Sequence, residues 1–171
     1  MNTLARLLAR QLLAALRTVQ FCIENCPDTE WQQDHGDYPF SQVVFHTLFY
    51  TDFYLGRDTI PFKQQVFHLE HQQIFKDYEE MADVLPTELY SREFCLEYLG
   101  HCRSKIKEVL ASESAGALAA GSGISFRKMS RAELHVYTTR HIQHHAAQLG
   151  FRLQRITGKE MPWISGESES L

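Results

Sequence analysis

The residues best suited to chemistry lie in one run, RHIQHHAAQLGF, at residues 140–151. His141 and His145 stand four residues apart in it, and a helix would place both imidazoles on one face, one turn apart. Two imidazoles in that arrangement can bind the same metal ion, because a neutral imidazole nitrogen is a good ligand for zinc. The run therefore predicts a metal centre, and we expect any reactive centre of the chain to lie here.

A third ligand has to come from another helix, and His46 is the best candidate. It sits in the middle of residues 40–56, the most apolar segment of the chain. A single histidine in such a segment is more often structural, but the helical pair elsewhere in a small domain favours a ligand. The pair shares an inward-facing stripe with Leu134, Tyr137, Thr138 and Leu149. Buried neutral imidazoles need partners, and a shared cation would supply one.

Four stretches carry apolar residues at helical spacing: 3–25, 40–56, 87–111 and 130–157. The second could also be a strand by its aromatic and β-branched content, but its length and neighbours favour a helix. The pattern predicts an all-α fold, a four-helix bundle in one domain over residues 1–160, followed by a polar tail at 161–171. The long connection between helices 2 and 3 allows a crossover.

Capping residues set the expected helix ends. Ser130 and Glu133 have the spacing of a capping box at the start of the last helix. The other expected end signals are Pro27 after the first helix, Ser41 and Gly56 around the second, Thr87 before the third and Gly158 after the fourth. Residues 57–86 are expected to fold in part, with a short helix near 71–82, and residues 112–126 are expected to form a mobile loop.

Composition excludes several classes of protein. Of the 171 residues, 44% are apolar and 22% are charged, and the net charge of −4 comes with no run of like charge. We therefore expect a soluble protein with no nucleic-acid partner. The segment 4–16 is interrupted by Arg6 and Arg10, so we expect neither a signal peptide nor a membrane partner, and a cytoplasmic location. The cysteines, Cys22, Cys26, Cys95 and Cys102, are expected to be buried free thiols.

A histidine in the middle of the second helix, a long crossover and the run HIQHHAAQL at 141–149 together resemble the DinB/YfiT superfamily. The resemblance covers about residues 3–157. It implies a bundle that binds zinc or nickel through His46, His141 and His145, a homodimer, and activity with a low-molecular-weight thiol. Gln148 and Leu149 match the family. Ala146 and Ala147 stand where it often has Arg-Gly, so any role of that arginine is absent.

Three imidazoles would leave a zinc ion at least one open position, as catalytic zinc sites do. Such an ion lowers the pKa of a bound water and would do the same for a thiol. Tyr50 and Tyr137 lie four residues from a predicted ligand and are candidate catalytic proton donors, although both could be ordinary core tyrosines. His144 is expected near the site or at the surface, and Gln148 could bond a ligand or cover the pocket.

The leading interpretation is a metal-dependent thiol S-transferase or hydrolase that acts on a small-molecule substrate. One alternative is a non-catalytic module of the stress response, for binding or dimerisation, with a structural metal. A degenerate site without metal is the other. The remaining histidines are expected outside the site: His68 and His71 at the surface, His35 in a loop, and His101 and His135 exposed.

Overall fold

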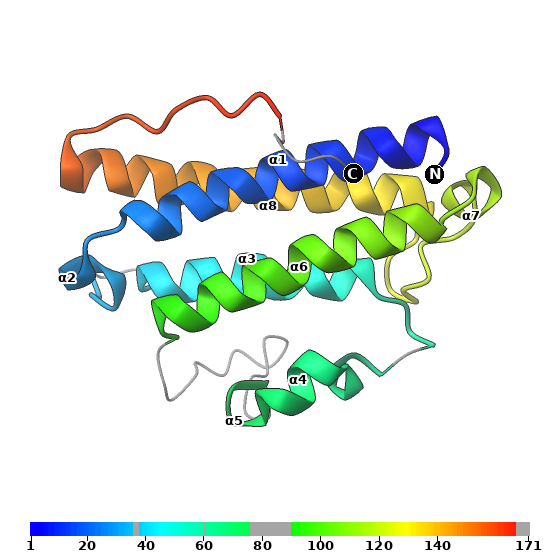
Figure 1. Cartoon of the computed structure of the whole chain (residues 1–171), viewed down its shortest axis with the longest axis horizontal. Coiled ribbons are helices and arrows are strands. Elements are labelled where there is room, and N and C mark those ends of the chain that lie inside the picture. The colour runs from blue at the N-terminus through cyan, green and yellow to red at the C-terminus, as the bar shows by residue number, and fades with distance from the viewer. Residues whose placement is uncertain (36–37, 60, 76–89, 167–171) are drawn as a thin grey trace.

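The computed structural model describes residues 1–35, 38–59, 61–75 and 90–166. Within these ranges the only elements are helices and one isolated β-bridge between Gly121 and Ser130, which confirms the all-α prediction. The four long helices are α1 (Thr3–Asn25), α3 (Phe40–Leu55), α6 (Arg92–Ser112) and α8 (Arg131–Thr157), and they lie along the longest axis of the molecule (Figure 1). No described helix is both long and apolar enough to cross a membrane.

The arrangement of the long helices decides which side chains can meet. α1 packs against α6 and α8, and α3 packs against the same two helices. α1 and α8 run in one direction while α3 and α6 run in the other (Figure 1). The connection from α3 to α6 carries η1 (Phe62–Gln64), α4 (Val66–Glu70) and α5 (Gln72–Phe75). Because α3 lies beside α8, residues in the middle of these two helices can share a site.

The ends of α8 are the ones that the sequence predicts. The Glu133 N–H donates to Ser130 Oγ at 3.2 Å, and the Ser130 N–H donates to Glu133 Oε2 at 2.7 Å. Gly158 follows the helix with a φ of +71°, a left-handed conformation that glycine adopts without steric cost. α8 therefore runs without a break through the predicted metal ligands.

Two predicted caps need comment. α3 begins at Phe40, directly after Pro39, so the prediction of Ser41 as its N-cap is wrong. The fixed φ of proline suits a helix start, and the Ser41 hydroxyl instead donates to Gln32 Oε1 at 3.0 Å. α6 begins at Arg92 with Ser91 as its cap. The predicted cap, Thr87, lies outside the described residues.

The connecting segments contain more helix than the sequence predicts. α2 (Asp28–Trp31) follows Pro27, and α7 (Ala115–Ala119) lies within the predicted loop at 112–126. α7 has a local cause, since Ser114 Oγ accepts the Ala117 N–H at 3.1 Å and Leu118 is fully buried. The helix expected near 71–82 is present as α5 over its described part, and residues 76–82 lie outside the described residues.

The four cysteines are buried free thiols, as predicted. Burial raises the pKa of Cys22 to about 12 and that of Cys26 to about 11, so both stay protonated at neutral pH. Cys22 Sγ also lies 3.6 Å from Met161 Sδ, in the segment after α8. A protonated, buried thiol is a poor nucleophile, so a thiol reaction at the predicted site would need a thiol from solution.

A buried carboxylate fastens the α3–α6 connection to the long helices. Asp52 of α3 is fully buried, and it accepts hydrogen bonds from His68 Nε2 at 2.7 Å and from the Tyr98 hydroxyl at 2.9 Å. Lys105 Nζ also bonds this carboxylate, and His101 Nε2 lies 3.5 Å from it.

The prediction that His68 lies at the surface is therefore wrong, and His101 is only partly exposed. His71, also predicted at the surface, is half-buried beside Glu97. His35 lies in an exposed loop, as predicted.

We expect this cluster to make the fold sensitive to acid. Burial alone would raise the pKa of Asp52, but the imidazoles of His101 and His68 and the charge of Lys105 outweigh burial and hold that pKa well below its ordinary value. A depressed pKa contributes stability that is present above the unfolded-state pKa of about 4 and is lost as the pH falls below it. In urea unfolding from pH 6 to pH 3, the unfolding free energy of Asp52→Asn should fall less steeply with decreasing pH than that of the wild type. The exposed control Glu108→Gln on α6 should follow the wild type, and an unchanged slope in Asp52→Asn would contradict the assignment.

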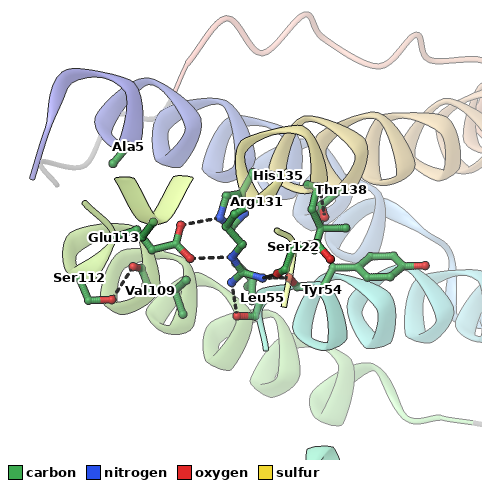
Figure 2. Close-up of polar contacts among 12 residues, drawn as sticks. Ala5, Tyr54, Leu55, Val109, Ser112, Glu113, Ser122, Arg131, His135 and Thr138 are labelled. Atoms are coloured by element: carbon green, nitrogen blue, oxygen red, sulfur yellow. Dashed lines mark hydrogen bonds and ion pairs between the residues drawn. The ribbon is translucent and has the colours of Figure 1, made fainter. Parts of the chain in front are cut away.

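A second buried polar cluster joins the start of α8 to the ends of α3 and α6 (Figure 2). Arg131 and His135, one turn apart on α8, both bond Glu113, which directly follows α6. Burial lowers the pKa of His135, although its hydrogen bond to Glu113 opposes that effect. The prediction that His135 is exposed is wrong, because its ring is fully buried against the carboxylate. This cluster fixes α8 relative to α3, and so fixes the two helices that carry the predicted metal ligands.

Candidate metal centre

The three predicted ligands meet between α3 and α8. His46 lies in the middle of α3, and His141 and His145 lie one turn apart in the middle of α8. Nε2 of His141 lies 3.3 Å from Nε2 of His46 and 3.2 Å from Nε2 of His145. Among the described residues, these three form the only group of histidine, cysteine and acidic side chains with the spacing of a metal site. The structure therefore brings together the three residues that the sequence singles out as metal ligands.

The separations of these nitrogens fit a metal ion better than they fit hydrogen bonds among the rings. With zinc–nitrogen bonds of about 2.0–2.1 Å, tetrahedral coordination places two ligand nitrogens about 3.3–3.4 Å apart. The two separations, 3.3 and 3.2 Å, lie close to that value. A neutral imidazole carries one N–H, so His141 Nε2 can share a proton with only one of its two nitrogen neighbours. A single cation would satisfy all three lone pairs together.

The electrostatics keep His141 in the form that binds metal. Burial is the largest cause of a lowered pKa at this ring, and together with positive charge on His145, His46, His144 and Arg127 it brings that pKa to about 3. Its ring is therefore neutral at pH 7 and offers a lone pair. Its Nδ1 is buried and has no hydrogen-bond partner in the described part of the chain.

Gln148 orients one of the three imidazoles. His145 Nδ1 lies 2.8 Å from Gln148 Oε1, an oxygen that can only accept, so we assign the proton of this ring to Nδ1. That tautomer directs the Nε2 lone pair of His145 at the other two rings. Of the two roles predicted for Gln148, the structure thus favours hydrogen bonding to a ligand. His144 is exposed, and its ring packs against that of His145 at 5.0 Å between centroids.

Aromatic rings line the site along α3 and α8. Tyr50 packs edge-on against His46 and His141, with ring centroids 5.0 and 5.5 Å apart. Tyr54 stacks on Tyr50 at 5.4 Å, and Tyr137 meets Tyr54 edge-on at 5.5 Å. Tyr50 thus touches two predicted ligands, whereas Tyr137 lies on α8 one turn before His141. Trp163, in the segment after α8, is 91% exposed.

Arg127 is the neighbour of the site that sequence reasoning missed. It lies in the segment between α7 and α8, and its Nη2 donates to the hydroxyls of both Tyr54 and Tyr137. Its guanidinium carbon lies 5.1 and 4.7 Å from the centroids of these two rings. No motif marks this position, because the path of a connecting segment is set by packing and not by periodicity.

The three histidines are each half-buried, and they lie apart from the cavities at the end of α3. A cavity of about 540 Å³ there is lined by Phe53, Phe62, Lys105 and Arg131, among others, and by none of the three histidines. A second hollow, of about 550 Å³, includes Arg127 and again none of the three. The candidate metal centre therefore lies between two helices and not at the bottom of either cavity.

Comparison with known families gave a match that spans the candidate metal centre. The model of a family described as the DinB superfamily matches residues 10–149 of the chain. The match contains α3 and most of α8, and so all three histidines. Comparisons with curated proteins and with solved structures gave no significant match.

Proposed function

The chain belongs to the DinB superfamily, and from that premise we propose that it is a metal-dependent enzyme of the thiol S-transferase or hydrolase type. His46, His141 and His145 would hold a divalent cation, zinc or nickel, and the substrate would be a small molecule. The observation that carries the proposal is the convergence of three imidazole nitrogens at 3.2 and 3.3 Å, with no protein carboxylate or thiolate in the group.

The donor set favours a reactive cation over a purely structural one, because structural zinc is usually closed by four protein ligands. When bound, the cation would act as a Lewis acid that lowers the pKa of a coordinated water or thiol. The chain itself contributes orientation and proton transfer. Gln148 fixes the His145 ring, and the Tyr50 ring packs against the rings of His46 and His141. Tyr50 and Tyr137 are the hydroxyls that we assign as proton donors.

The same premise extends to the architecture. We propose that α1, α3, α6 and α8 form the four-helix bundle of this superfamily, with the long connection between α3 and α6 as its crossover. The parallel directions of α3 and α6 support this (Figure 1). We also propose a cytoplasmic homodimer that works with a low-molecular-weight thiol.

Elemental analysis of protein purified without an affinity tag tests the proposal. We expect about one zinc or nickel ion per chain, and turnover in a panel of small thiols with organic electrophiles, or with ester substrates. A chelator should abolish that turnover, and added metal should restore it. A chain that carries no metal and takes up none would overturn the proposal.

A structural metal is the second candidate, and the position of the histidines outside both cavities favours it. The chain would then be a binding or dimerisation module. Chelation would lower the melting temperature, since a ligand of the native state stabilises it, but no substrate in the panel would turn over. Any metal-dependent turnover excludes this reading.

A further inference from the structure

Arg127 carries a positive charge for which the described residues provide no carboxylate partner. Its guanidinium carbon lies within 5.3 Å of the ring centroids of Tyr54, Tyr137 and Phe126. Three aromatic rings thus hold the guanidinium in place. Arg57 and Arg131, by contrast, both bond Glu113. A cation held by aromatic rings without an acidic partner is available to an anionic ligand.

The hydrogen-bond donors around Arg127 are arranged for an anion. Nη2 donates to the Tyr54 and Tyr137 hydroxyls, which also hydrogen-bond each other, so the two tyrosines hold the guanidinium in place and keep at most one hydroxyl hydrogen free to donate elsewhere. Burial raises the pKa of Tyr54, so its hydroxyl stays protonated. The described residues offer no acceptor to Nη1, which leaves its two N–H groups to a ligand. A carboxylate has two oxygens that can accept from such a set.

The same rings connect Arg127 to the candidate metal centre. Tyr54 stacks on Tyr50, and Tyr50 packs against His141 at 5.5 Å between centroids. Tyr137 precedes His141 by one helical turn on α8, which is about 6 Å along the helix axis. A small molecule bound at the three histidines could therefore extend along the tyrosines to Arg127.

We propose that Arg127, held in place by Tyr54 and Tyr137, forms a carboxylate-binding subsite next to the three histidines. This inference rests on the proposed function, because it names the class of molecule that the site takes: small thiols or electrophiles with a carboxylate several atoms from the reacting group. Arg127 is then a specificity-determining residue and not a metal ligand.

The first experiment uses the metal-free protein, so that its result does not depend on the metal. Butyrate should shift the Arg127 Nε–H signal in ¹⁵N NMR spectra of the arginine side chains, and the neutral isostere butyramide should not. The signal is assigned by its loss in Arg127→Met. This variant should bind butyrate about 10–100-fold more weakly, which corresponds to the free energy of a hydrogen bond to a charged group. Lys128→Met, which removes the exposed neighbouring cation, is the matched control and should bind butyrate like the wild type.

The second experiment uses cobalt(II) as a spectroscopic replacement for zinc. The cobalt-loaded protein should bind 4-mercaptobutyrate at least about 10-fold more tightly than 4-mercaptobutyramide, and Arg127→Met should lose that preference while it takes up cobalt normally. Failure to take up cobalt overturns the proposed function but leaves the butyrate result standing. Equal binding of butyrate and butyramide by the wild type overturns the subsite even if cobalt binds. If Arg127→Met does not fold, the comparison of acid and amide in the wild type decides alone.

Discussion

Replacing His141 with alanine is expected to weaken zinc or nickel binding by about 100-fold or more, since structural zinc sites bind their ion with about 10–16 kcal/mol in total and each ligand contributes a share of it. His141 is the position of largest effect because its Nε2 lies between the other two, at 3.3 Å from that of His46 and 3.2 Å from that of His145. Competition with a chromophoric chelator measures the affinity. Circular dichroism checks that the helices remain, which we expect because the ring lies at a half-buried position.

Two neighbouring variants sharpen this result. His144→Ala removes an imidazole from the same turn of α8, but this exposed ring is not among the three ligands, so its affinity for metal should match the wild type. The metal affinity of Gln148→Ala should lie between those of His144→Ala and His141→Ala, about 10–100-fold below the wild type. This variant frees the His145 ring without removing a ligand. Equal losses in His144→Ala and His141→Ala would show that charge or helix stability, and not coordination, sets the affinity.

The candidate metal centre could be predicted because its geometry is mostly local. The capping box at Ser130 and the left-handed Gly158 fix α8 as one continuous helix, and a continuous helix places residues 141 and 145 on one face. His46 needed only one further assumption, that a polar residue in the middle of an apolar helix faces the core. These conclusions depend on helical periodicity, which a sequence displays directly.

The errors arose where a side chain depends on a partner far along the chain. His68 and His135 carry no local sign of burial, yet each lies against a carboxylate from another element, Asp52 or Glu113. A histidine in a polar stretch reads as exposed until its partner is placed. Arg127 was missed for the same reason, because Tyr54, its partner, lies 73 residues away. Long-range packing decides such positions, and hydrophobic periodicity does not report it.

Arg131 has two structural roles: it pairs with a buried carboxylate, and it bonds carbonyl groups at the end of α3. The Arg131 side chain is fully buried, and its Nε donates to Glu113 Oε1 at 2.6 Å (Figure 2). Its Nη2 donates to Leu55 O at 2.7 Å, and its Nη1 lies 2.9 Å from the carbonyl oxygens of Tyr54 and Gly56. The last carbonyls of a helix have no partner within the helix. Arg131 therefore satisfies the end of α3 and neutralises a buried carboxylate at once.

Arg131→Met is accordingly expected to lower the unfolding free energy by about 3–5 kcal/mol, the cost of breaking a buried ion pair from one side. Methionine fills similar space but leaves the Glu113 carboxylate without its closest cation and the α3 carbonyls without donors. Urea unfolding at pH 7 measures the change, with the exposed Arg140→Met on the same helix as a control that should change little. The double variant Glu113→Leu/Arg131→Met should lose less than the sum of the single variants, because it removes both charges together. Additive losses would show that Arg131 acts mainly through the α3 carbonyls, and a loss below about 1 kcal/mol in Arg131→Met would contradict both roles.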